Sequence, residues 1–186
     1  MPNPSDPPDP LGSERRPVEI VDSNPGWPGL ALVESARLSD GMGAALLRVE
    51  HVGSTSVPGL AAKPIIDLCP VVTSLSNLDR RQRNVEALGY VWRGEFGIPG
   101  RRYCSRDIAG VRRFQLHCFE DGGEELGRML VFRDYLRAHV NEARGYEAEK
   151  RRAASAHPSD ILAYNDAKSD WIIACRQRAM DWARVR

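Results

Sequence analysis

One segment constrains the fold of this chain more than any other, the nearly continuous apolar run PIIDLCPVV at residues 64–72. Such a run is typical of a strand that is covered on both faces, because a half-exposed strand alternates apolar and polar residues. We therefore expect it in the middle of a sheet. Its one charged residue, Asp67, needs a cation or hydrogen-bond donors nearby, since an unpaired carboxylate in such a strand costs several kcal/mol.

The remaining sequence predicts more strands and then helices. Apolar spacing and turn signals predict helices at 30–40 and 75–88, and strands near 18–21 and at 46–52, 90–96, 101–107 and 111–119. From Glu124 onward no strand-like alternation remains, and Pro158, Ser159 and Asp160 mark the start of a new helix. The predicted fold class is α+β, with a mixed β-sheet flanked by helices and a helical C-terminal part.

Composition divides the chain into a tail and one domain. The first ten residues contain five prolines, and residues 1–16 have almost nothing apolar to bury, so we expect them to be disordered. Residues 17–186 are expected to form a single domain, with a sheet core at about 17–120 and a helical part at about 124–186. Because 26 Lys and Arg nearly cancel 25 Asp and Glu, any anion site must be local and a polynucleotide partner is not expected.

The cysteines and the hydropathy of the chain bear on its location. Four widely spaced cysteines form no CxxC pair, and the sequence has no apolar signal segment, which predicts reduced thiols in a cytoplasmic protein. No window is apolar for long enough to cross a bilayer, so no membrane partner is expected. Trp171 and Trp182 lie on the apolar stripe of the last helix, which predicts core packing or a dimer surface, hence a monomer or a homodimer.

Several blocks of the sequence resemble one family. HVGSTSVPGLAAKPIIDL, VDSNPGWP, LHCF, FRDYLRAHVNEARGYEAEK and YNDAKSDWI are similar to the blocks of GrpB-like proteins, in the same order, from about residue 18 to about residue 179. The resemblance implies a fold similar to that of nucleotidyltransferases, in which a Gly-Ser turn and an acidic strand meet at one edge of a cleft. It also implies a nucleotide ligand, because that turn holds nucleotide phosphates in nucleotidyltransferases.

The Gly-Ser turn comprises Gly53, Ser54, Thr55 and Ser56. Glycine lets the backbone approach an anion closely, and the three hydroxyl groups add donors, so the turn is predicted to bind phosphate. The alternative is an ordinary strand-to-helix turn with a Ser or Thr cap. The flanking resemblance favours the phosphate site.

The strand after this turn departs from the nucleotidyltransferase pattern. Asp67 is predicted to be a catalytic residue and a magnesium ligand, but the position two residues later, where those enzymes usually place a second carboxylate, is Cys69. A thiol is a poor ligand for magnesium, which prefers oxygen, so two-metal chemistry needs another carboxylate. The candidates are Glu50, Asp107, Glu120 and Asp121.

Other candidate residues carry a positive charge or a proton. Lys63 and His117 are predicted to be catalytic, with His117 on the strand face opposite Phe114 and Leu116, and His51 has the same ambiguity between catalysis and structure. Arg133 and Arg137 lie four residues apart on one helix face, where they either clamp a phosphate or pair with nearby carboxylates. The doublet of Arg101 and Arg102 is a further candidate for anion binding.

Three hypotheses about function follow. The first is a nucleotidyltransferase-type transferase that acts on a small acceptor, with magnesium and a nucleoside triphosphate as its cofactors. The second is a binding module for a nucleotide or a CoA-related ligand without catalysis, since related domains are joined to dephospho-CoA kinase. The third is a metal-free acid–base enzyme that uses Asp67 and His117 on an acidic small molecule.

Overall fold

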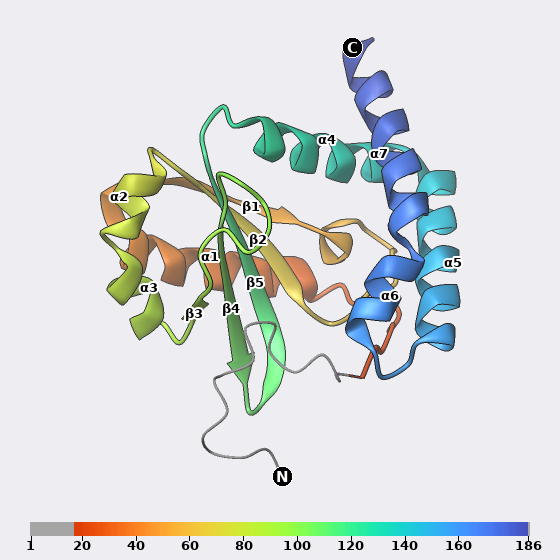
Figure 1. Ribbon diagram of the computed structural model, residues 1–186, viewed down its shortest axis with the longest axis horizontal. Coiled ribbons are helices and arrows are strands. Elements are labelled where there is room, and N and C mark those ends of the chain that lie inside the picture. The colour runs from red at the N-terminus through yellow and green to blue at the C-terminus, as the bar shows by residue number, and fades with distance from the viewer. Residues whose placement is uncertain (1–16, 186) are drawn as a thin grey trace.

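The computed structural model describes residues 17–185, and a five-stranded sheet lies at its centre (Figure 1). The strands are β1 (Leu46–Val52), β2 (Ile66–Val72), β3 (Val91–Trp92), β4 (Arg102–Ile108) and β5 (Val111–Glu120), in the order β1-β2-β5-β4-β3. Because β2 pairs antiparallel with β1 and parallel with β5, the sheet is mixed. The α+β class and the interior position of the apolar strand are therefore confirmed. The tail predicted at 1–16 lies outside the described residues.

Helices surround this sheet. They are α1 (Trp27–Met42), α2 (Leu75–Asp79), α3 (Gln82–Ala87), α4 (Glu124–Ala138), α5 (Val140–Ala156), α6 (Ile161–Ala167) and α7 (Ser169–Arg184). Figure 1 shows α5, α6 and α7 grouped beside the sheet, and we call this group the helical wall. As predicted, Asp160 starts a helix, because its carboxylate accepts from the backbone N–H groups of Leu162 and Ala163. No helix within residues 17–185 is long and apolar enough to cross a membrane.

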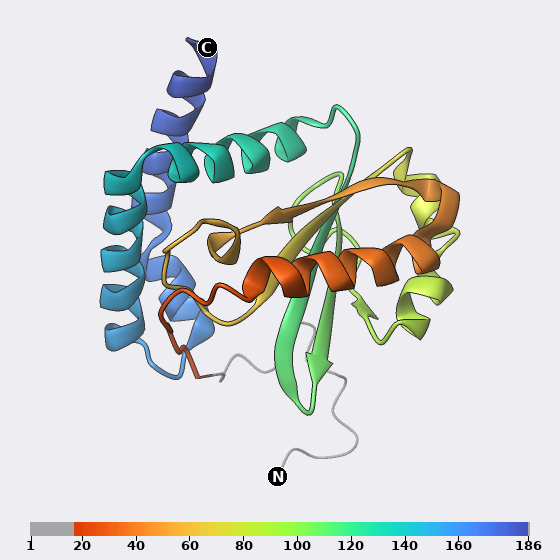
Figure 2. The ribbon, with the colours of Figure 1, turned by 180° about the vertical axis from the view of Figure 1, so that it is seen from behind.

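The two faces of the sheet are covered differently. Leu68 of β2 and Leu116 of β5 belong to an apolar cluster with α1, which lies across one face of the sheet (Figure 2). Alternate residues of a strand share a face, so Cys69 and Val71 of β2 point the other way, where Leu126 of α4 packs against them. α1 packs along one face of the sheet, whereas α4 covers only part of the other face. The uncovered part of that second face lies above the start of β2.

Three predicted elements are shorter than their sequence pattern suggests. The strand near 18–21 is reduced to a single bridge between Val21 and Ala62, because Val18 packs with α5 and α6 instead. The strand at 90–96 stops after Trp92, since Gly94 has a φ of 62° and the chain turns into a loop. The helix at 75–88 is broken into α2 and α3, with the Arg81 N–H bonded to the Leu78 carbonyl in a tighter turn.

The tryptophans of the last helix pack within the chain. The ring of Trp171 stacks on Tyr146 of α5 with centroids 5.2 Å apart, and Trp182 meets Tyr135 of α4 edge-on at 5.7 Å. Both belong to the apolar contact of α7 with α4 and α5. The packing role predicted for them is therefore observed.

Because β2 and α1 share the main core, truncating β2 should be costly. Leu68 is fully buried, so Leu68→Ala is expected to lower the free energy of unfolding by about 2–5 kcal/mol. Leu32, on the outer side of α1, is 73% exposed, and Leu32→Ala should change it by less than about 0.5 kcal/mol. Urea unfolding followed by circular dichroism measures both. Equal losses of unfolding free energy in the two variants would contradict the assignment of Leu68 to the core and of Leu32 to the outer face of α1.

Candidate functional site

A cavity of about 1020 Å³ lies over the sheet face that α1 does not cover. β2, β4 and β5 contribute to it, with the loop at 93–101 on one side and the helical wall on the other. Among residues 17–185, two carboxylates line it, from Glu19 and Asp67, against eight basic side chains, namely Lys63, Arg93, Arg101, Arg112, Arg133, Lys150, Lys168 and Arg176. Arg112 pairs with Asp107, and Arg133 pairs with Glu50 and Asp134, outside this lining. The other basic side chains still outnumber the two lining carboxylates, although the net charge of the whole chain is only +1.

Asp67 and the Gly-Ser turn are fitted to each other. Asp67 is the second residue of β2 and pairs with Val52, the last residue of β1. Gly53 is the next residue after Val52, so it lies beside Asp67. A Cβ atom on Gly53 would lie 2.4 Å from Oδ2 of Asp67, so only glycine leaves room for the carboxylate. Gly53 also has φ 69° and ψ −173°, a conformation that is essentially restricted to glycine. Glycine at position 53 is therefore what allows the Asp67 side chain to lie here.

The hydroxyl groups of the turn already have partners. Ser56 Oγ donates to the carbonyl of Gly53 at 2.7 Å, and Ser56 does not line the cavity. Ser54 and Thr55 do line it, Ser54 in a hydrogen bond with Tyr146 and Thr55 in one with His51 Nε2 at 3.0 Å. These internal hydrogen bonds hold the turn in place at the edge of the cavity. Phosphate binding by the turn stays a prediction.

His51 is held neutral. The pKa of His51 is lowered to about 4, mainly by burial and also by the positive charges of Arg137 and Arg133, while Asp67 acts in the opposite direction. An imidazole with that pKa carries no charge near neutral pH. Its hydrogen bond to Thr55 indicates a structural role within the turn.

Arg101 orients the ring of His117. The guanidinium of Arg101 is buried and donates to the carbonyls of Glu95 and Phe96 and to Nδ1 of His117, the last at 3.3 Å. Arginine has no acceptor, so Nδ1 of His117 must accept and the ring proton lies on Nε2. This Nε2 is 3.6 Å from Oδ1 of Asp67. The Nε2 of His117 therefore faces the Asp67 carboxylate at a distance longer than a direct hydrogen bond.

Arg133 and Arg137 both have partners within the protein, and phosphate binding by the pair stays a prediction. Arg133 lines the cavity, but its Nη1 donates to Glu50 Oε2 at 2.8 Å and its Nε to Asp134 at 2.8 Å. Arg137 Nε donates to the carbonyl of Ser56 at 3.0 Å, and Arg137 does not line the cavity. The sequence placed both on one helix face correctly, but it could not show that Arg137 braces the Gly-Ser turn from behind.

The donor set does not fit a two-magnesium centre. Cys69 points to the same face as Asp67 but is packed with Val71 and Leu126, and burial raises the pKa of its thiol to about 12. The four candidate replacements all have other partners: Glu50 with Arg133, Asp107 with Arg112, Glu120 with the Leu75 N–H, and Asp121 with Arg48. Within residues 17–185, no three His, Cys, Asp or Glu residues are grouped as metal ligands would be.

Sequence reasoning did not assign the buried lysines of the helical wall to the site, although it named Lys150 as a candidate neighbour of Arg133 and Arg137. Lys150 of α5 is 2% exposed, its ammonium donates to the carbonyl of Ala61, and burial lowers its pKa to about 7. Lys168 lies between α6 and α7, and burial followed by the charge of Lys63 lowers its pKa to about 8. Lys168 falls at helical spacing among apolar residues such as Tyr164 and Ile172. A charged residue on an otherwise apolar helix face was the one feature of the sequence that could have indicated a buried lysine.

Comparison with known proteins identifies the family. Residues 17–178 match the family model described as GrpB protein. The chain belongs to the GrpB family. The crystal structure of the conserved protein GrpB from Enterococcus faecalis is 36% identical, covers 89% of this chain and 99% of that one, and superposes with a TM-score of 0.84.

Relatives of the GrpB-family chain include longer proteins. UPF0157 protein YqkA of Bacillus subtilis is 38% identical over 172 residues, which are 92% of this chain and 50% of that protein. A protein named dephospho-CoA kinase, from Mycolicibacterium paratuberculosis, is 32% identical over 91% of this chain and 47% of its own length. This chain therefore spans about half the length of either relative. The likeness to nucleotidyltransferases stays a prediction.

The fit between Gly53 and Asp67 is testable by stability. Gly53→Ala introduces both a strained backbone and a clash with the carboxylate, and is expected to cost more than about 3 kcal/mol of unfolding free energy. Gly59 has a φ of 76° but nothing within 4 Å of a new Cβ, so Gly59→Ala should cost only about 1–2 kcal/mol. Chemical denaturation compares them. Equal costs would show that Asp67 does not press on Gly53.

Proposed function

We propose that this GrpB-family chain binds a nucleotide or another phosphorylated small molecule in the cavity, and that binding needs no two-magnesium centre. The excess of cations in the cavity wall carries the proposal. Two of these basic groups, Arg101 and Lys150, are buried and donate to carbonyl oxygens, with one further bond from Arg101 to His117 Nδ1, and within residues 17–185 no hydrogen bond to a carboxylate is observed for either. A buried cation without a bound carboxylate is costly, and an anionic ligand would offset that cost through charge-assisted hydrogen bonds.

The size and the aromatic walls of the cavity favour a nucleotide within this class. Its volume of about 1020 Å³ is at the upper end of the range for small-molecule sites and suits a ligand larger than a single phosphate. Phe96, which is exposed, stacks on Tyr103 at the loop side of the cavity, with ring centroids 4.9 Å apart. Aromatic faces of this kind stack with nucleobases.

The comparisons bear on the ligand class. The relative named dephospho-CoA kinase contains a segment similar to this chain, and a kinase of that name acts on a CoA precursor. A CoA-related nucleotide is therefore included among the proposed ligands. The same proposal places the protein in the cytoplasm, where its four buried, free cysteines would stay reduced.

Acid–base catalysis without a metal is a second candidate. His117 Nε2 faces the Asp67 carboxylate, which lies inside a positively charged cavity. Such a carboxylate could take a proton from a bound anionic substrate. Nucleotidyl transfer to a small acceptor, with Asp67 on magnesium, stays a prediction from the family resemblance, and the observed donors lend it less support.

Isothermal titration calorimetry with ATP, CoA and dephospho-CoA tests the proposal. We expect binding of at least one ligand in EDTA, and a loss of about tenfold or more in Arg101→Met, because that change removes a buried donor from the cavity. Arg102→Met is the matched control, since the Arg102 guanidinium pairs with Asp79 and does not line the cavity. Binding that requires magnesium and disappears in Asp67→Asn would favour the transferase instead. No binding of any of these ligands would contradict the proposal.

A further inference from the structure

Lysine is confined to one place in this protein. The chain contains 23 arginines but only three lysines, Lys63, Lys150 and Lys168, and all three line the cavity. Lysine differs from arginine in that its ammonium is a compact point charge and in that burial readily removes its proton, whereas a guanidinium stays charged. The restriction of lysine to the cavity indicates a site that uses these properties.

The three ammonium groups converge at the helical wall from different parts of the chain. Nζ of Lys63 lies 5.2 Å and Nζ of Lys168 lies 4.8 Å from the ring centre of the same residue, Tyr164. Nζ of Lys150 lies 4.6 Å from the ring centre of Tyr146. Lys63 lowers the pKa of both other lysines, so the like charges are close enough to repel.

The carboxylate beside Lys150 is already engaged. Glu147 attracts Lys150, but its two oxygens accept from the Ala61 N–H at 3.2 Å and from Arg151 at 3.0 Å. Arg151 also adds a positive charge next to Lys150. The negative charge available to this lysine is therefore shared with a guanidinium.

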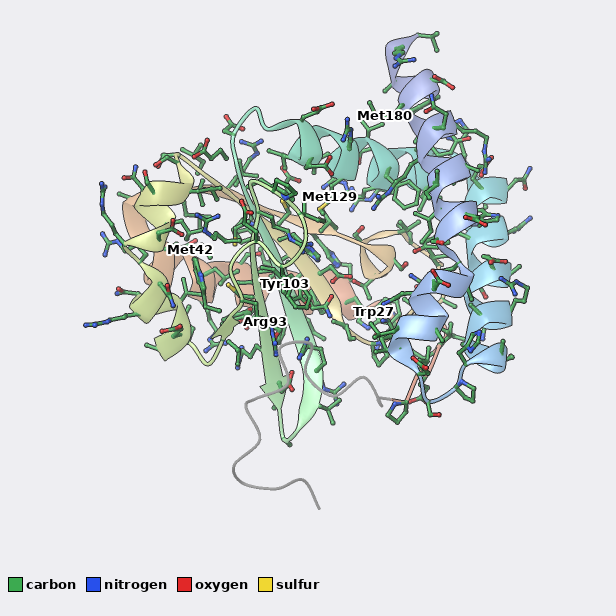
Figure 3. The ribbon with its side chains drawn as sticks, viewed as in Figure 1. Trp27, Met42, Arg93, Tyr103, Met129 and Met180 are labelled. Atoms are coloured by element: carbon green, nitrogen blue, oxygen red, sulfur yellow. The ribbon has the colours of Figure 1, made fainter. Side chains whose placement is uncertain are left out.

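The lysines form a group that is distinct from the arginines of the sheet. The charged groups that act on Lys168 are Lys63, Arg176 and Asp67, whereas those that act on Tyr103 of β4 are Arg112, Asp67, Arg101 and Arg93. Asp67 belongs to both sets. Figure 3 shows Arg93 and Tyr103 over the strands, well apart from the helical wall.

We propose that Lys63, Lys150 and Lys168 form a subsite for the polyphosphate chain of a nucleotide, and that binding there is coupled to proton uptake by the lysines. The inference rests on the proposed function and specifies where the phosphates lie. Several adjacent ammonium groups match several adjacent phosphate charges, and lysine binds phosphate as a point charge. The arginines of the sheet and Asp67 then face the remainder of the ligand.

The direction of the proton coupling follows from the free protein. Burial lowers the pKa of Lys150 to about 7 and that of Lys168 to about 8, so near pH 8 neither lysine is fully protonated. A bound polyphosphate stabilises the protonated forms and raises both pKa values, so binding at pH 8 takes up protons. Above pH 7.5 the charge of the phosphates hardly changes, and affinity should fall as the pH rises to 9.5.

Calorimetry in EDTA with ATP, AMP and inorganic tripolyphosphate tests the subsite. Repeating each titration at pH 8 in two buffers of different ionisation enthalpy gives the number of protons taken up. For the wild type we expect net uptake and tighter binding of ATP than of AMP. Lys168→Met should weaken ATP and tripolyphosphate binding about tenfold or more and remove the preference of ATP over AMP. Arg144→Met, at an exposed position of α5 that does not line the cavity, should change neither.

A second variant separates charge from titration. Lys168→Arg keeps the positive charge but cannot lose it at pH 8, so it should retain ATP binding with reduced proton uptake and a flatter pH dependence. ATP binding that is unchanged in Lys168→Met and involves no proton uptake would overturn the subsite while leaving the proposed function intact. Tripolyphosphate binding that needs the lysines, without binding of any nucleotide, would support the subsite and contradict the proposed nucleotide.

Discussion

The contact between the Asp67 carboxylate and the backbone of Gly53 is the constraint on which the site depends. Asp67 occupies space that any other residue at position 53 would fill with a Cβ atom. Two hydrogen bonds stabilise the Gly-Ser turn itself. Ser56 Oγ donates to the carbonyl of Gly53, and Arg137 Nε donates to the carbonyl of Ser56. These contacts fix the end of β1 against the start of β2, and they hold a charged group on an otherwise apolar strand at the edge of the cavity.

The sequence allowed the central strand, the α+β class and the positions of Asp67 and His117 to be predicted, because all of these depend on local pattern. Alternation along β5 places His117 opposite Leu116, and this is enough to bring it to the cavity. Lys150 and Lys168 could not be placed, since they reach the cavity only through the packing of α5, α6 and α7. The strand at 90–96 was predicted too long because its glycine turn overrides the apolar pattern.

The missing second carboxylate has a structural explanation. Cys69 lies where α4 covers the sheet, and a small apolar side chain suits its contacts with Val71 and Leu126. The negative charge of the cavity is thereby reduced, and the surrounding lysines and arginines dominate its field. A site that has one central carboxylate and many cations is better suited to holding an anionic ligand than to holding two divalent ions.

The central claim is that this cavity binds a phosphorylated ligand directly through its basic side chains. A crystal structure of the protein with ATP in the presence of EDTA tests it most directly. We expect phosphate oxygens of ATP within hydrogen-bond distance of Lys150 or Lys168. The rest of the nucleotide should extend past Asp67 toward Tyr103. ATP bound outside the cavity, or bound inside it only when magnesium is added and coordinated by Asp67, would contradict the account.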